Sequence, residues 1–91
     1  MLFMVVERFH DPHAAYARFE AKGRQAPPEA RYVDSWVDAT GTRCFQLMEC
    51  AELKPLMQWV AAWRDIVDFE IYPVVPSKEA AEIYGAGKAE D

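Results

Sequence analysis

The sequence predicts an α+β fold of the ferredoxin-like type, in which strands and helices follow one another in the order βαββαβ. Three observations lead to this prediction: a central hairpin within residues 32–50, one strand and one helix before it, and one helix and one strand after it. We therefore expect one domain over residues 1–76 with a four-stranded antiparallel sheet. Residues 77–91 are expected to add a short C-terminal helix and a frayed tail.

Residues 2–23 predict the first strand and the first helix. Residues 2–9, LFMVVERF, are apolar on both faces for most of their length, which is typical of a central strand covered on both sides. Asp11 and Pro12 then predict a helix start, because aspartate is a good N-cap and proline at the first helical position loses no hydrogen bond. Gly23 fits the position after the helix end. The helix would bury Ala15, Tyr16 and Phe19.

The central hairpin turns at Thr40 and Gly41, since glycine adopts the positive φ of a tight turn. The resulting pairing sets Asp38 opposite Arg43, Trp36 opposite Phe45, Asp34 opposite Leu47 and Tyr32 opposite Glu49. One face would carry Tyr32, Asp34, Trp36, Phe45, Leu47 and Glu49. The other would carry Val33, Ser35, Val37, Cys44, Gln46 and Met48. A one-residue bulge would exchange these sets on one strand.

A second helix is expected to begin near Glu52, with Pro55 in its first turn, where backbone N–H groups lack helical partners. Residues at helical spacing form its apolar stripe. They are Leu56, Trp59, Val60 and Trp63.

The last strand is expected over residues 66–75, where apolar and polar residues alternate. Pro73 lies near the end of this strand and Pro76 follows it, which indicates an edge position because proline cannot donate a backbone hydrogen bond. Ser77 then caps a short helix, SKEAAEIY, which Gly85 ends.

The composition indicates a small domain with more apolar surface than it can bury alone. The 91 residues are 52% hydrophobic and 13% aromatic, with a net charge of −5. A chain of this size buries only about 60% of its unfolded surface, so part of the aromatic surface is expected to face another subunit. No basic stripe is present, which argues against nucleic acid, and the acidic balance argues against anionic membranes.

The sequence indicates a cytoplasmic protein. No apolar run reaches the roughly 18 residues that cross a bilayer. Cys44 and Cys50 are six residues apart on one strand, which separates them by about 20 Å, too far for a disulfide. We therefore interpret both as reduced, buried thiols.

Glu70 and Tyr72 are the first candidate functional residues. They lie beside Asp68 on the polar face of the last strand, whose other face is apolar. This face is either solvated, as in many antiparallel sheets, or closes over a partner's sheet to enclose a cavity. In such a cavity the carboxylate and the phenol would orient a ligand, or Glu70 would move a proton if burial raised its pKa.

Two further polar residues stand among apolar ones. Gln46 is flanked by Phe45 and Leu47, so its amide must bond to a neighbour such as Ser35 or to a ligand. Glu7, near the end of the first strand, either bonds to the backbone, pairs with a group near Arg8 or enters the same cavity.

No motif for a metal or a cofactor is found. His10 and His13 lack further ligands at a suitable spacing, and no glycine-rich loop opens a helix. Trp59 and Trp63 have helical spacing and are interpreted first as core or interface residues.

Four segments carry a family resemblance: MLFMVVERF, RYVDSWVD, RCFQLMEC and WRDIVDFEIYPVV. Together they resemble a small bacterial family known only as a domain of unknown function, over nearly the whole chain to about Val75. That family is similar to the dimeric α+β barrel superfamily, in which two ferredoxin-like protomers pair their sheets into one barrel. The superfamily includes antibiotic-biosynthesis-type and haem-degrading monooxygenases, muconolactone-isomerase-like enzymes and stress-responsive proteins.

The resemblance implies a fold and a dimer, but it supplies no catalytic residues. The Asn, Trp and His set of the haem-degrading enzymes has no counterpart that can be placed on this sequence.

We therefore expect a cytoplasmic homodimer whose paired sheets enclose a cavity for a small apolar or aromatic molecule, without metal or cofactor. A cofactor-independent monooxygenase or an isomerase of the same shape is the first alternative, and a structural interaction module with a filled barrel is the second. The expected pocket residues are Glu7, Trp36, Gln46, Glu70 and Tyr72.

Overall fold

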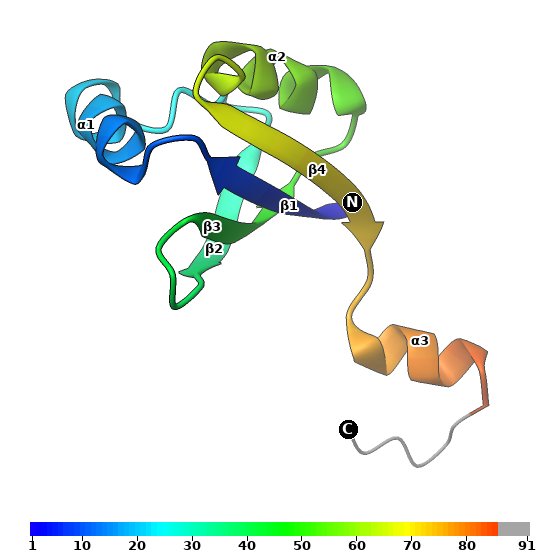
Figure 1. Ribbon diagram of the computed structural model, residues 1–91. Helices are drawn as coiled ribbons and strands as arrows, with labels where there is room; N and C mark the ends of the chain where they lie inside the picture. The colour runs from blue at the N-terminus through cyan, green and yellow to red at the C-terminus, as the bar shows by residue number, and fades with distance from the viewer. Residues whose placement is uncertain (86–91) are drawn as a thin grey trace.

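The computed structural model of the chain describes residues 1–85. Its elements are β1 (Leu2–Phe9), α1 (Pro12–Lys22), β2 (Arg31–Val37), β3 (Arg43–Glu49), α2 (Leu53–Trp63), β4 (Val67–Val74) and α3 (Ser77–Ile83). The strands form one antiparallel sheet in the spatial order β2-β3-β1-β4 (Figure 1). The predicted ferredoxin-like α+β fold is confirmed. The predicted frayed tail lies outside the described residues.

The hydrophobic core lies between the sheet and α2. Alternate residues of β1 and β3 are buried, as expected for strands with one covered face. From α2, Leu56, Trp59 and Trp63 are buried against them, which confirms most of the predicted stripe, while Val60 is half-buried. The cluster of buried residues comprises Phe3, Val5, Ala30, Met48, Cys50, Leu56, Trp59, Trp63 and Val67.

β1 is central in the sheet, between β3 and β4, as predicted. The expectation that both of its faces are covered is wrong for the single chain. Phe3 and Val5 are buried, whereas Leu2, Met4 and Val6 on the other face are only half-buried. The sheet therefore keeps one face without a covering layer from residues 1–85.

The hairpin register agrees with the prediction near the turn and departs from it at the far end. Trp36 lies opposite Phe45 as predicted, and Asp34 lies opposite Leu47. A bulge between Tyr32 and Asp34 then shifts the pairing, so Tyr32 lies opposite Met48 instead of Glu49. The bulge moves Tyr32 to the face that the helices cover.

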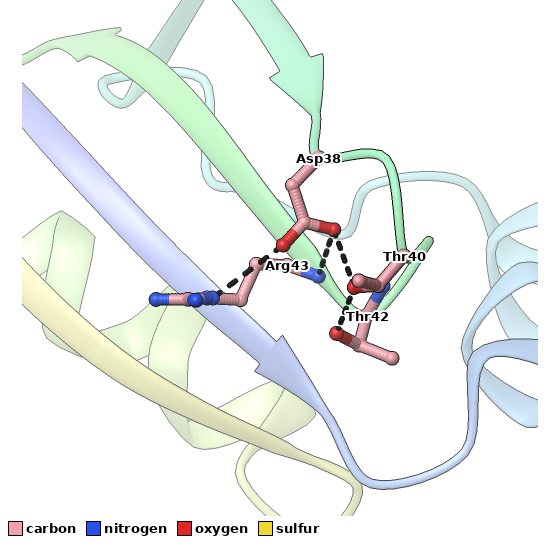
Figure 2. Close-up of polar contacts among 4 residues, drawn as sticks. All are labelled: Asp38, Thr40, Thr42 and Arg43. Atoms are coloured by element: carbon pink, nitrogen blue, oxygen red, sulfur yellow. Dashed lines mark hydrogen bonds and ion pairs between the residues drawn. The ribbon is translucent and has the colours of Figure 1, made fainter.

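The hairpin turn is held by the carboxylate of Asp38 (Figure 2). It accepts hydrogen bonds from the Thr40 hydroxyl at 2.8 Å and the Arg43 backbone N–H at 3.4 Å, and it forms an ion pair with the Arg43 side chain at 3.5 Å. The Thr40 bond is the main cause of a lowered Asp38 pKa. Gly41 has a φ of 75°, as the turn prediction required.

α1 covers the sheet more loosely than predicted. Asp11 caps it by accepting a hydrogen bond from the His13 backbone N–H at 3.0 Å, and Gly23 follows its last residue. Ala15 is its only buried residue. Tyr16 and Phe19 are 52% and 43% exposed, so the prediction that both are buried is wrong. Both side chains line a cavity between α1 and the sheet.

The last strand is one residue shorter at each end than predicted and lies at the sheet edge, as its prolines indicated. Ser77 is the first residue of α3, and Pro76 precedes it as the cap without a side-chain bond, so the predicted Ser77 cap is wrong. α3 lies beyond the end of β4, apart from the sheet and the other helices (Figure 1), and none of its residues is buried.

Candidate functional site

A cavity of about 180 Å³ lies between the sheet and the helices α1 and α2. Its walls are mostly apolar and aromatic, with polar groups contributed by three strands and by the loop after α1. This composition is typical of sites for small molecules. The lining residues are Glu7, Phe9, Ala15, Tyr16, Phe19, Arg24, Ser35, Val37, Cys44, Gln46, Trp59, Trp63, Val67 and Phe69.

Two buried polar side chains form the floor of the cavity. Glu7 on β1 is 9% exposed and Gln46 on β3 is 4% exposed. The strand register places Glu7 opposite Cys44 and Val5 opposite Gln46, so the two polar residues lie on adjacent strands, on the face below the helices. They occupy positions where the alternation of β1 and β3 calls for apolar residues, which is the signal that singled them out in the sequence.

Burial dominates the electrostatics of Glu7. Removal from water raises the pKa of its carboxyl group from 4.5 to about 7, against the opposing effects of the Arg24 charge and a hydrogen bond with the Cys44 thiol. Burial and the neighbouring Glu7 raise the pKa of Cys44 to about 11. Near neutral pH the cavity therefore contains a carboxyl group that readily takes up or releases a proton, beside a thiol that remains protonated.

Gln46 has a weak partner. Its amide N–H donates to the Met48 sulfur at 3.2 Å, and thioether sulfur is a poor acceptor. The expected bond to Ser35 is not formed; the Ser35 hydroxyl instead lies 2.8 Å from the Tyr32 hydroxyl, which the bulge brings to this face. Hydrogen-bonding capacity of the Gln46 amide thus remains for a molecule in the cavity.

Arg24 contributes the positive charge at the cavity. Its guanidinium carbon lies 3.9 Å from the centroid of the Tyr32 ring and 5.3 Å from that of Phe19. Its backbone carbonyl accepts hydrogen bonds from the indole N–H groups of Trp59 at 3.1 Å and Trp63 at 2.8 Å. These contacts fix both the loop and the side chain.

Arg18 anchors α1 to the C-terminal end of α2. The Arg18 guanidinium donates two hydrogen bonds to the Asp65 carboxylate, at 2.8 and 2.7 Å, and one to the Ala62 carbonyl at 3.2 Å. The Arg18 bond lowers the pKa of Asp65 to about 2. Tyr16 meets Phe9 edge to face, with ring centroids 5.9 Å apart. The helix is therefore anchored while its apolar residues remain available to the cavity.

The other three expected pocket residues lie on the opposite face of the sheet. Tyr72 and Glu70 on β4 are joined by a hydrogen bond of 2.7 Å, which the phenol donates. Trp36 lies on β2, at the other edge of the same face. The structure thus brings Glu7 and Gln46 together in one cavity and Glu70 and Tyr72 together elsewhere, with Trp36 apart from both pairs.

This second face, which we call the open sheet face, is apolar at its centre and charged at its margins. Pairing residues share a face, so the register defines its members. Its charged members are exposed or, for Glu49, half-buried: Arg8, Arg31, Asp34, Arg43, Glu49, Asp68 and Glu70. The apolar and aromatic ones are Leu2, Met4, Val6, Trp36, Phe45, Leu47, Tyr72 and Val74.

Arg24, Trp59 and Trp63 line the cavity although the sequence does not assign them to a site. Helical spacing predicts the two tryptophans as core or interface residues, and both are buried. Nothing in the local sequence marks Arg24, because its position depends on the loop that crosses above the sheet.

Residues 1–85 contain no group of three or more His, Cys, Asp or Glu side chains arranged to hold a metal ion. His10 is 3.0 Å from the Asp68 carboxylate. None of the helices in this range has the length and apolar character that crossing a bilayer requires.

Comparison with known proteins gives one result. The sequence matches the family described as a domain of unknown function (DUF3303) over residues 1–88. No curated protein and no solved structure matches the chain.

Proposed function

We propose that this chain, which belongs to the DUF3303 family, is a homodimer that binds a small apolar or aromatic molecule in the cavity between its helices and its sheet. The observation that carries this proposal is an apolar cavity with two buried polar groups, Glu7 and Gln46, at its floor. Within residues 1–85 the Gln46 side chain bonds to the Met48 sulfur and the Glu7 side chain to the Cys44 thiol, and sulfur is a weak hydrogen-bonding partner, so both groups can still bond to a ligand.

The cavity volume limits the size of the ligand. At about 180 Å³ it is slightly larger than an engineered protein cavity of roughly 150 Å³ that holds benzene. A single aromatic ring with a small substituent matches this volume. Trp59 and Phe69, which meet edge to face with centroids 5.7 Å apart, supply aromatic wall on which such a ring can pack.

A neighbouring pair of variants tests the binding site. Ala15 is 4% exposed and lines the cavity, so Ala15→Leu fills part of its volume. Ala17 is exposed on the same helix and does not line the cavity, so Ala17→Leu is the matched control. Calorimetry with neutral single-ring probes, benzamide and benzyl alcohol, should show binding to the wild type and the control and loss of binding in Ala15→Leu. Equal binding to all three proteins would refute the site.

Proton transfer on the bound molecule is the second candidate function. Glu7 supports it, because a carboxyl group with a pKa near 7 can accept a proton from a substrate carbon and return it to another position at neutral pH. Such an isomerisation needs no cofactor. Once a binding compound is found, Glu7→Gln should retain binding and lose any rearrangement seen by NMR. The absence of rearrangement in the wild type would leave ligand binding as the function.

The open sheet face supports the homodimer. A contiguous apolar centre bordered by charged residues is typical of a protein interface. Met4 and Leu47 pair across β1 and β3 near its centre. Size-exclusion chromatography with light scattering should report a dimer for the wild type and a monomer for Leu47→Glu. A wild-type monomer at micromolar concentration would refute this part of the proposal.

We also place the protein in the cytoplasm. Cys44 and Cys50 are both buried and free, as expected in a reducing compartment.

A further inference from the structure

We propose that the natural ligand of the cavity is an aromatic molecule with an anionic group, such as a carboxylate, that Arg24 binds at the cavity edge. This inference rests on the proposed function and specifies the charge of its ligand. Three features of the described residues support it: the preorganised Arg24 side chain, the lack of a direct partner for its charge, and the buried polar groups that line the same cavity.

The Arg24 side chain is held ready to bind. The Tyr32 and Phe19 rings lie near its guanidinium carbon, at 3.9 and 5.3 Å from their centroids. A guanidinium that stacks on an aromatic ring keeps the N–H donors in its own plane free for other partners. Those donors match the two oxygens of a carboxylate. Fixing the side chain beforehand lowers the entropy lost on binding.

The charge of Arg24 lacks a direct partner within residues 1–85. The ion pairs of these residues join Arg18, Arg31 and Arg43 to carboxylates, a further polar contact joins His10 to Asp68, and Arg24 is in none of them. Glu7 interacts with Arg24 only through the longer-range charge effect. Arg24 is half-buried, Glu7 is buried, and both residues line the cavity.

The remaining charges favour an anion over a cation at this end of the cavity. Among the described lining residues the ionisable groups are Glu7, Arg24, Tyr16 and Cys44, and Arg24 is the positive one. No ionisable side chain of β2, α2 or β4 lines the cavity within the described residues. Because the whole chain carries a net charge of −5, attraction of an anion must come from such a local positive group.

Binding of an anion beside Arg24 also predicts proton uptake. A second negative charge in the cavity disfavours the ionised form of Glu7, whose pKa is already about 7. Glu7 should therefore take up part of a proton when the ligand binds near neutral pH. The affinity should weaken by up to about tenfold per pH unit above the pKa of Glu7.

Three probes of the same shape and different charge test the inference: benzoate, benzamide and benzamidine. By calorimetry near neutral pH, benzoate should bind more tightly than benzamide, and benzamidine should bind least. Repeating the benzoate titration in buffers of different ionisation enthalpy should reveal proton uptake, which Glu7→Gln should abolish.

Variants of Arg24 provide the second test of the anion inference. Its backbone carbonyl, which holds Trp59 and Trp63, is retained in any substitution. Arg24→Gln should weaken benzoate binding at least tenfold and leave benzamide binding nearly unchanged, whereas Arg24→Lys should retain part of the preference. Arg64 is exposed at the end of α2 and does not line the cavity, so Arg64→Gln is the matched control for the loss of one positive charge.

The outcomes separate the two claims. Equal affinity for benzoate and benzamide, with no effect of Arg24→Gln, would overturn the anion inference and leave the binding function intact. Failure of all three probes to bind at millimolar concentration would overturn both. Loss of benzoate binding in Arg64→Gln as well would show a general charge effect and would overturn the role of Arg24.

Discussion

Replacing Glu7 by glutamine should make the protein more stable at neutral and alkaline pH. The substitution keeps the size of the side chain and removes the charge that burial disfavours. Burial raises the pKa of Glu7 from 4.5 to about 7, so the folded state holds this proton over a pH range in which the unfolded chain has released it.

The sign and the size of the effect follow from linkage. Below about pH 4.5 both states are protonated and the residue adds no pH dependence. Between about pH 4.5 and about pH 7 the folded state binds more protons, so the free energy of unfolding falls as pH rises, by at most about 1.4 kcal/mol per unit. The shift from 4.5 to about 7 gives a total of roughly 3 kcal/mol. That is a large part of the 5 to 15 kcal/mol typical of a domain, as an order of magnitude.

Urea unfolding at a series of pH values measures this difference. The stability of Glu7→Gln minus that of the wild type should rise by roughly 3 kcal/mol from about pH 4 to about pH 8. Other groups titrate in both proteins and cancel. Glu20 is exposed on α1 and outside the cavity, so Glu20→Gln should show a change within about 0.5 kcal/mol. A flat difference for Glu7→Gln would refute a desolvated carboxyl group at this site.

Three further predictions concern the core, the hairpin turn and the Cys44 thiol. Leu56 is fully buried in the core, so Leu56→Ala should lower the free energy of unfolding by about 2 to 5 kcal/mol in urea unfolding. Gly41 has a φ of 75° with open space around it, so Gly41→Ala should cost about 1 to 2 kcal/mol from backbone strain alone; an unchanged thermal midpoint would contradict this. The pKa of Cys44 rises from 9.0 to about 11, which lowers the fraction of thiolate about a hundredfold. The Cys44 thiol should therefore react with a disulfide reagent far more slowly in the folded protein than in urea. Rapid reaction of both cysteines in the folded state would contradict the burial of Cys44.

The element order was predictable because its signals are local. The Asp11 and Pro12 start of α1, the Gly41 turn and the apolar spacing of α2 each depend on neighbouring residues, and the structure contains all three. The position of the bulge in β2 could not be predicted, because the sequence of the strand is compatible with pairing both with and without an extra residue. Its effect on Tyr32 shows how a shift of one residue changes the face and the partners of a side chain.

The candidate site was predictable only in part. Glu7 and Gln46 are polar residues in apolar strand positions, a mismatch that the sequence shows directly. Arg24 lies in the loop after α1, and its contact with the Tyr32 ring depends on the bulge in β2. Neither its place at the cavity nor this contact can be predicted from the neighbouring sequence. Tyr16 and Phe19 were predicted in the core because helical spacing does not reveal a cavity below a helix.

The three tryptophans allow the most direct test of the central claim that the cavity below α1 and α2 is the binding site. The indole N–H groups of Trp59 and Trp63 lie at the cavity, whereas Trp36 lies on the open sheet face. In an NMR titration of ¹⁵N-labelled protein with benzoate, the indole signals of Trp59 and Trp63 should shift until they saturate, and that of Trp36, identified by its loss in Trp36→Phe, should not move. A shift of the Trp36 signal alone would place the ligand between paired sheets and contradict the account.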